Sequence, residues 1–216
     1  MSSRRPSPLH GARPTRADLA AVDTTDPCAL DDVLPAVPDT LRLLIVGINP
    51  GLWTAAVRAP FAHPGNRFWP SLHRAGLTSR LVDASRGLDL ADEQDLLDRG
   101  LGITNLVGRA TARAAELDRE ELRTGGAALL GRLPRLRPRV VAIAGITAFR
   151  SAFGVPRARL GRQDPGTVAG WPEGPGAPVL WVVPQPSGLN AHATIDSLAA
   201  TWREVAAEAG VEAAAS

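Results

Sequence analysis

The stretch Leu43–Gly51 constrains the fold of this chain more than any other part of its sequence. It is an apolar run that stops at Gly47, offers the amide side chain of Asn49 and then turns at Pro50 and Gly51. Such a run is typical of a buried strand, and a Pro-Gly pair is typical of a sharp turn. The pattern predicts that Asn49 lies in a loop at the carboxyl end of a strand, where open α/β sheets bind their ligands.

Three further apolar runs have the length of a buried strand, at residues 101–107, 139–145 and 179–183. Helical segments are predicted between them, at 91–99, 116–133 and 146–153, with a weak point in the second at Gly125 and Gly126. Continuous apolar strands that alternate with helices are typical of a parallel sheet covered on both faces. The sequence therefore predicts a three-layer α/β/α fold around a central, mainly parallel four-stranded sheet.

Two more helices and one loop are predicted around these strands. Residues 52–64 show neither the helical nor the strand periodicity of apolar residues and contain two prolines, which indicates a loop. A helix follows, with Pro70 in its first turn and an apolar face of Phe68, Trp69, Leu72 and Gly76. In the last helix, Thr194 is the expected N-cap and Gly210 the end. Its apolar stripe consists of Ile195, Leu198, Trp202, Val205 and Ala209.

The domain organisation is expected to be simple. Residues 1–38 are rich in Pro, Arg, Ser and Asp and indicate a mostly disordered arm with at most a short turn of helix. Residues 39–210 form one domain, and 211–216 form a tail. The Gly/Pro-rich segment 154–178 is long for a connection in a compact domain, which indicates a functional or a mobile loop.

Composition excludes several kinds of chemistry. The single cysteine, Cys28, excludes internal disulfides and metal sites built from several thiolates, and the four histidines have no ligand-like spacing. No apolar run approaches the length of a membrane span, and the N-terminus lacks the apolar core of a signal peptide, so a cytoplasmic protein is expected. Every basic residue is Arg, three of them within Arg157–Arg162. Guanidinium groups suit phosphate contacts, although a codon bias explains the absence of Lys equally well.

Three segments with polar or turn residues follow predicted strands, at 47–51, 104–111 and 184–190. In a parallel sheet, the carboxyl ends of the strands lie at the same edge. Asn49 and residues 186–190 are therefore expected to face one cleft, although they are far apart in sequence.

Residues 47–51, 60–69 and 186–189, with weaker matches at 102–111 and 140–145, occur in the order found in a known family. In these motifs the chain resembles the mismatch-specific uracil and thymine DNA glycosylases of the uracil-DNA glycosylase superfamily. The resemblance implies the fold of that superfamily and a role in base excision repair. The base leaves the helical stack, and the bond that joins it to deoxyribose is hydrolysed, leaving an abasic site. It implies no metal or other cofactor.

The resemblance assigns roles in the first motif. Asn49 orients the water that attacks the sugar carbon, a positioning role that suits an oxocarbenium-like transition state. Phe61 stacks on the flipped base, and backbone N–H groups around Ile48 and Phe61 hold the departing base as an anion. Thr54 lies near carbon 5 of that base, where thymine carries a methyl group and uracil does not.

Other positions of the first motifs are expected to support the site. These are Gly47, Pro50, Gly51, His63 and Asn66. For His63 and Asn66, shaping the loop or capping the next helix is favoured over catalysis. Arg67 is expected to contact either a phosphate or an acidic neighbour.

In the last motif, Ser187, Gly188, Leu189 and Asn190 are the expected DNA contacts. Ser187 and Gly188 approach the DNA backbone, and Leu189 fills the gap that the flipped base leaves. Ala191 stands where the family has an Arg that reads the opposite strand, a role for which Asn190 and His192 are candidates.

The chain also departs from the family at Gln185, where a close bacterial relative has Asn, and at Trp53 and Thr54, where small residues are common. The expected partner is double-stranded DNA that contains uracil or a mismatched pyrimidine, bound by a monomer, with G·U preferred over G·T. Thymine, ethenocytosine and oxidised pyrimidines stay open as substrates.

Two other functions compete with this one. The first is a DNA-damage-binding module of the same fold with little activity. The second is a nucleotide-binding α/β protein, which the lack of a GxGxxG motif and of a P-loop Lys disfavours.

Overall fold

A short fifth strand joins the four predicted strands in the central sheet. The computed structural model describes residues 4–188 and 190–214, with strands β1 (Leu43–Gly47), β2 (Leu101–Asn105), β3 (Val140–Ala144), β4 (Gly161–Arg162) and β5 (Val179–Val183). Their order is β2-β1-β3-β5-β4, with β4 antiparallel to β5 and the other neighbours parallel. The mainly parallel sheet is confirmed. The expected count of four misses β4, because two residues are too few to show a period.

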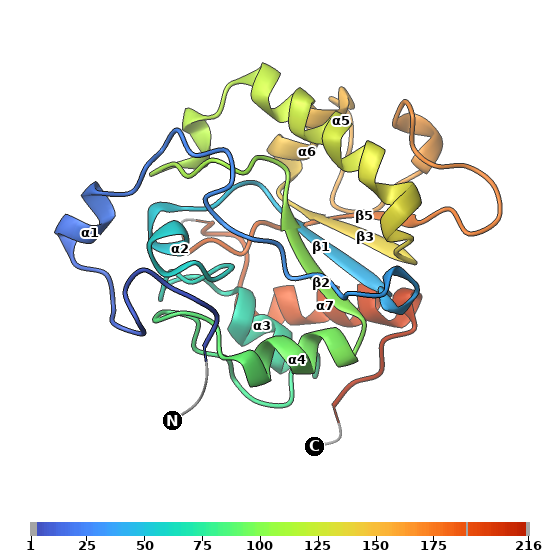
Figure 1. Cartoon of the computed structure of the whole chain (residues 1–216). Coiled ribbons are helices and arrows are strands. Elements are labelled where there is room, and N and C mark those ends of the chain that lie inside the picture. The colour runs from blue at the N-terminus through green and yellow to red at the C-terminus, as the bar shows by residue number, and fades with distance from the viewer. Residues whose placement is uncertain (1–3, 189, 215–216) are drawn as a thin grey trace.

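Helices cover both faces of this sheet, which confirms the three-layer α/β/α architecture (Figure 1). They are α1 (Arg16–Ala20), α2 (Leu52–Val57), α3 (Phe68–Arg74), α4 (Leu90–Asp98), α5 (Arg119–Leu136), α6 (Ile146–Phe153) and α7 (Ile195–Ala209), with 3-10 turns η1 (Pro38–Thr40), η2 (Ala114–Glu116) and η3 (Pro165–Thr167). Leu43 and Ile45 of β1 belong to the core beneath α3, α4 and α7. Leu44 and Val46 belong to the core beneath α5 and α6. Successive residues of a strand thus enter opposite cores.

The last helix, α7, confirms its predicted bounds. The Thr194 hydroxyl accepts a hydrogen bond from the Ser197 N–H at 3.0 Å, and Gly210 ends the helix with a φ of +68°. Within the apolar stripe, Trp202 is fully buried, and its indole N–H donates to the Ser71 hydroxyl on α3 at 3.1 Å. This bond satisfies two buried polar groups between α7 and α3.

The two glycines of α5 mark a close approach between elements. A Cβ on Gly125 would lie 2.3 Å from the Leu106 carbonyl oxygen, and one on Gly126 would lie 2.8 Å from that of Ala152. Both positions are buried inside a continuous helix. The expected weak point is therefore where α5 packs most closely on the β2 loop and on α6, which only a residue without a side chain permits.

The helix α2 replaces the loop predicted for residues 52–64. It spans two short turns and ends at Arg58, whose φ is +51°. Four consecutive residues, Thr54 to Val57, are buried. A helix packed on all sides shows no amphipathic period, which is why the prediction of a loop was wrong over 52–57.

Residues 4–38, for which the sequence indicated a mostly disordered arm, lie against the domain. Val33 exchanges two backbone hydrogen bonds with Ile103, of 2.9 and 2.8 Å, on the free edge of β2. The Ala29 N–H donates to the Gly108 carbonyl at 3.2 Å. The arm thus covers an edge strand that would otherwise expose unpaired backbone groups. The difference from expectation arises because every one of these partners is remote in sequence.

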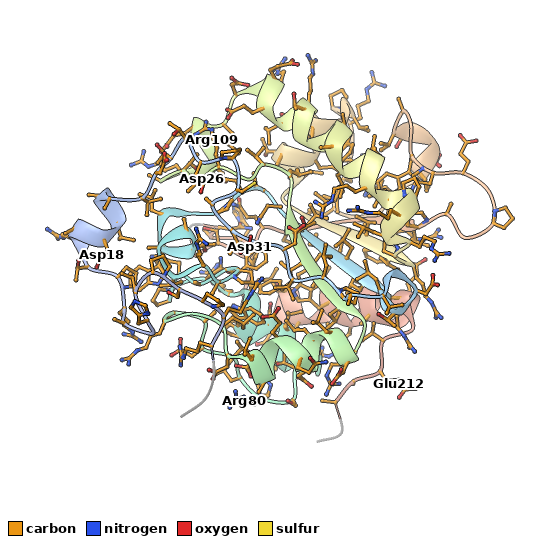
Figure 2. All side chains as sticks on the ribbon, viewed as in Figure 1. Asp18, Asp26, Asp31, Arg80, Arg109 and Glu212 are labelled. Carbon is orange, nitrogen blue, oxygen red and sulfur yellow. The ribbon has the colours of Figure 1, made fainter. Side chains whose placement is uncertain are left out.

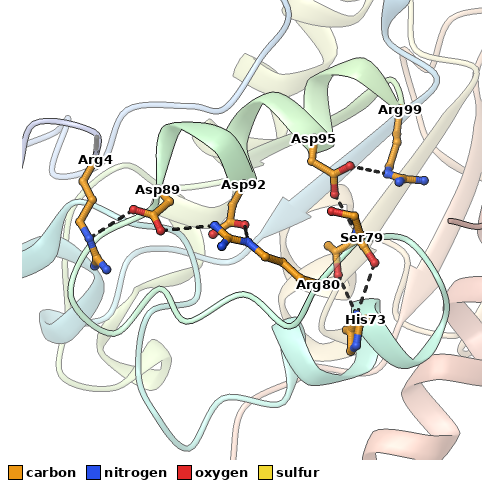
Figure 3. A network of polar contacts seen from close by, with 9 residues as sticks. Arg4, His73, Ser79, Arg80, Asp89, Asp92, Asp95 and Arg99 are labelled. Atoms are coloured by element: carbon orange, nitrogen blue, oxygen red, sulfur yellow. Dashed lines mark hydrogen bonds and ion pairs between the residues drawn. The ribbon is translucent and has the colours of Figure 1, made fainter. Parts of the chain in front are cut away.

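Ion pairs fasten the start of the arm to α4. Arg4 Nε lies 3.3 Å from Asp89 Oδ1, and Arg5 Nε lies 3.1 Å from Glu93 Oε2. Arg80 in turn lies between Asp89 and Asp92, with its Nε 2.6 Å from Asp92 Oδ1. Figure 3 shows this row of carboxylates along α4, with Arg4 at one end.

Candidate active site

The Asn49 amide is held in one orientation by the loop that follows β2. Its Nδ2 donates to the Thr111 hydroxyl at 2.8 Å, to the Arg109 carbonyl at 3.0 Å and to the Pro50 carbonyl at 3.1 Å. Two of these acceptors are carbonyl oxygens, so a flipped amide would place oxygen against oxygen. The nitrogen is therefore fixed by the protein, in a residue that lines the cleft.

A cleft of about 1140 Å³ lies at the carboxyl edge of the sheet. Among the residues singled out from the sequence, it is lined by Gly47, Ile48, Asn49, Gly51, Thr54, Phe61, His63, Asn66, Ser187, Gly188 and Asn190. Pro50 is buried behind it, and Leu189 lies outside the described residues. The structure thus brings the first and last motifs together around one cavity. A smaller cavity of about 300 Å³ between the arm and α2 contains none of these residues.

Phe61 lines the cleft, and its ring packs in a stack with a second aromatic ring. That ring belongs to Phe68, with ring centroids 3.8 Å apart and planes 22° apart. Its φ of +53° bends the chain at this point. A Cβ on Gly47 would lie only 3.3 Å from Phe61 Cζ, so a glycine at this position leaves room for the ring. The arrangement is that of a stacking platform for a planar ligand.

Thr54 is buried and has two contacts of different kinds. It lines the cleft, and its hydroxyl accepts a hydrogen bond from the Ala62 N–H at 3.3 Å. It therefore holds the turn that carries Phe61, a role that the sequence did not show. Trp53 also lines the cleft, but its indole N–H is tied to the Ser85 carbonyl at 3.0 Å.

His63 and Asn66 both bond to nearby backbone. His63 Nδ1 accepts from the Gly65 N–H at 3.0 Å, and Asn66 Oδ1 accepts from the Phe68 N–H at 2.9 Å, at the start of α3. These contacts are with the backbone of the loop and of the helix start.

Arg67 joins the first and last motifs, which sequence reasoning missed. Its Nη1 donates to the carbonyls of Asn190 and Ala193, each at 2.8 Å, and its backbone N–H donates to the Pro186 carbonyl at 2.8 Å. Within the protein, Arg67 thus contacts the loop that carries the last motif rather than the acidic neighbour that was one of the two expectations. No local pattern in the sequence indicates partners more than a hundred residues away.

The last motif is packed closely onto the first. A Cβ on Gly188 would lie 2.6 Å from the Gly65 carbonyl oxygen, so only glycine fits there. The Asn190 amide is engaged within its own loop, because Nδ2 donates to the Gln185 carbonyl at 3.0 Å and Oδ1 accepts from the His192 N–H at 3.2 Å. His192 is exposed and lines the cleft.

Asn105 is a further cleft residue that the sequence analysis passed over. It ends β2 opposite Gly47 of β1, and its side-chain oxygen would lie 2.4 Å from a Cβ at that glycine. A second amide therefore lines the cleft beside Asn49. The signal was present, because a polar residue at the end of an apolar strand points to the same edge of the sheet.

The segment that holds Asn49 is itself anchored by an ion pair. Arg109, whose carbonyl accepts from Asn49, pairs through its guanidinium with Glu121 on α5, with Nη2 3.0 Å from Oε2 (Figure 2 marks Arg109). The Arg109 guanidinium, together with the Asp118 N–H, lowers the pKa of Glu121 to about 2. The carboxylate is therefore charged at neutral pH and keeps the segment in place.

Over residues 4–188 and 190–214, no three His, Cys, Asp or Glu side chains gather as they would around a metal ion. No helix in the same ranges has the length and apolar character needed to cross a membrane.

The structure is a mainly parallel α/β sheet with two amides and an aromatic side chain lining the cleft at its carboxyl edge. A sequence model described as the uracil DNA glycosylase superfamily matches residues 34–206. The chain therefore belongs to the uracil DNA glycosylase superfamily, whose members are typically hydrolytic DNA glycosylases. Membership indicates glycosylase activity on uracil, with DNA as the partner.

Proposed function

We propose that this protein is a monofunctional glycosylase that removes uracil from double-stranded DNA, prefers G·U to G·T pairs and acts as a cytoplasmic monomer. The observation that carries the proposal is the fixed amide of Asn49, whose Nδ2 is held by three acceptors and which lines the same cleft as Phe61. The flipped base stacks on the open face of Phe61. Its sugar then lies toward Asn49.

In this mechanism, Asn49 positions water rather than deprotonating it. Its Oδ1 accepts a hydrogen bond from the water, whose lone pair points at carbon 1′ of the sugar. The bond between carbon 1′ and the base breaks with its electron pair on the base, and the water oxygen bonds to carbon 1′ while its proton leaves to the departing base or to solvent. An amide is sufficient because bond breaking runs ahead of attack in an oxocarbenium-like transition state.

The first motif stabilises the departing base, and the last motif contacts the DNA. Backbone N–H groups near Ile48 and Phe61 stabilise the negative charge on the departing base. Ser187, Gly188 and Leu189 contact the DNA that the base has left, with Leu189 filling the gap in the stack. The packing of Gly188 on Gly65 and the bonds from Arg67 support this role, because they fix the last motif relative to the base pocket.

The proposal is tested with Asn49→Ala on a duplex that carries one G·U pair. Base release in a single turnover, read as strand cleavage at the abasic site, should fall by at least 10³-fold, whereas binding should stay within a few fold because phosphate contacts and stacking supply most of the affinity. Release that survives nearly intact would contradict the role of Asn49. A wild-type protein that binds the duplex without releasing uracil would instead identify a damage-binding module.

A further inference from the structure

An exposed Leu, Leu160, lies at the rim of the cleft, on the turn that precedes β4. Leu160 lines the cleft, and half of its surface is accessible to solvent. The antiparallel register pairs Gly161 with Val182 of β5, so Leu160 lies beside the carboxyl end of β5, where the last motif begins. The position is thus at the same edge of the sheet as Asn49.

This turn is held rigidly. Arg150 donates two hydrogen bonds, of 3.1 and 2.6 Å, to the carbonyl of the buried Ala158. On the other side of Leu160, Gln163 Nε2 donates to the carbonyls of Arg159 and Gly161, each at 2.7 Å. These bonds fix the backbone on both sides of an apolar side chain that is left in solvent. A single exposed Leu is ordinary, but one fixed at the mouth of a ligand cleft is typical of a contact surface.

The cations on the turn fall into two kinds. Arg162 pairs with Glu208 of α7, with Nε 2.7 Å from Oε1. Arg157 and Arg159 are exposed, and neither guanidinium has an ion pair or hydrogen bond to any described residue. The turn thus presents the apolar Leu160 next to the guanidinium groups of Arg157 and Arg159, which are unpaired among the described residues. This pattern matches a nucleic acid strand, in which apolar sugar and base faces lie between phosphates.

We propose that the turn 157–160 is a second DNA-contacting element, separate from the last motif. Leu160 packs on the sugar or base next to the flipped nucleotide, and Arg157 and Arg159 bind the adjacent phosphates. The inference rests on the proposed function, because the strand reaches this turn only when its base occupies the cleft. It gives a role to the fixed backbone of this turn within the long connection between α6 and β5.

The test measures binding to a duplex with 2′-fluoro-2′-deoxyuridine opposite guanine, by fluorescence anisotropy over a range of salt concentrations. The electron-withdrawing fluorine destabilises the oxocarbenium-like transition state. The bond between the sugar and the base is therefore not hydrolysed, and binding can be measured without cleavage. Arg157→Gln with Arg159→Gln should reduce the slope of log K against log salt by about 1.8, two phosphate contacts. Leu160→Ala should weaken binding about 3- to 10-fold at an unchanged slope, since about half of a Leu side chain is buried on binding.

Matched controls separate this inference from the proposed function. Arg162→Gln removes a cation that is already paired, and Leu81→Ala truncates a Leu that is 57% exposed but does not line the cleft. Both should bind as the wild type does. If the wild type releases uracil but the turn variants bind like these controls, with unchanged thermal midpoints, the inference is wrong and the function stands. If the wild type neither releases uracil nor prefers the modified duplex, both fail.

Discussion

At the scale of single residues, Thr54 both lines the cleft and holds the turn that carries Phe61. Its hydroxyl accepts a hydrogen bond from the Ala62 N–H. In the proposed function, carbon 5 of the base lies beside Thr54. A β-branched side chain has little freedom to rotate away, so the space there would be reduced permanently. The same rigidity keeps the hydroxyl on Ala62.

Two substitutions separate these roles. Thr54→Ser removes the methyl group and keeps the hydroxyl, so thymine release from G·T should rise relative to uracil release from G·U by about tenfold, within the range of about 1–3 kcal/mol for one methyl group. Thr54→Val keeps the size and removes the acceptor, so both rates should fall while their ratio stays the same. Single-turnover rates on the two duplexes measure this. If only Trp53→Ser changes the ratio, Trp53 sets the pocket wall and the argument for Thr54 is wrong.

At the scale of elements, α5 supports the site through one ion pair. Glu121 in its first turn holds Arg109, and the Arg109 carbonyl holds Asn49. Because the pKa of Glu121 is lowered to about 2 in the folded protein, from about 4.3 when unfolded, the pair stabilises the fold above about pH 4.5. This contribution is lost as the pH falls toward 2.

Glu121→Gln should therefore lower the free energy of unfolding at pH 7 by about 1 kcal/mol, the scale of a partly exposed pair. The difference from the wild type should shrink below about pH 4 and vanish near pH 2. Uracil release at neutral pH should slow several-fold, because Arg109 loses its anchor. Glu120→Gln is the matched control, since Glu120 is 79% exposed and lies 3.9 Å from its Arg123 partner. Equal effects of the two changes in urea titrations would show that net charge alone is responsible.

The elements that sequence reasoning predicted correctly carry their signals locally. The strand β1 is a continuous apolar run that stops at Gly47, and α7 has its cap at Thr194 and its stop at Gly210. The position of Asn49 followed from β1 in the same way. The helix α2 and the contacts of Arg67 were missed because burial on all sides erases a period and because partners such as Asn190 are remote in sequence. Asn105 does have a local signal, because it is a polar residue at the end of the apolar strand β2.

At the scale of the whole molecule, the arm at residues 4–38 belongs to the architecture in two separate ways. Val33 covers the edge of β2, whereas Leu19 and Leu30 line the cleft on the side of α1. Figure 1 shows α1 beside α2, beyond the carboxyl edge of the sheet. The match to the superfamily begins at residue 34, after both features. The arm therefore adds an edge cover and a cleft wall to the part of the chain that the superfamily model matches.

Two truncations should separate the edge cover from the cleft wall. Removal of residues 1–24 takes away Leu19 and the ion pairs to α4 but keeps Val33, so the thermal midpoint should fall by only a few degrees while uracil release changes. Removal of residues 1–36 exposes the unpaired edge of β2, so the midpoint should fall further and the protein should aggregate at high concentration. Calorimetry and light scattering measure both. If the longer truncation is as stable and as soluble as the shorter one, the Val33 pairing contributes nothing and residues 1–38 are a dispensable tail.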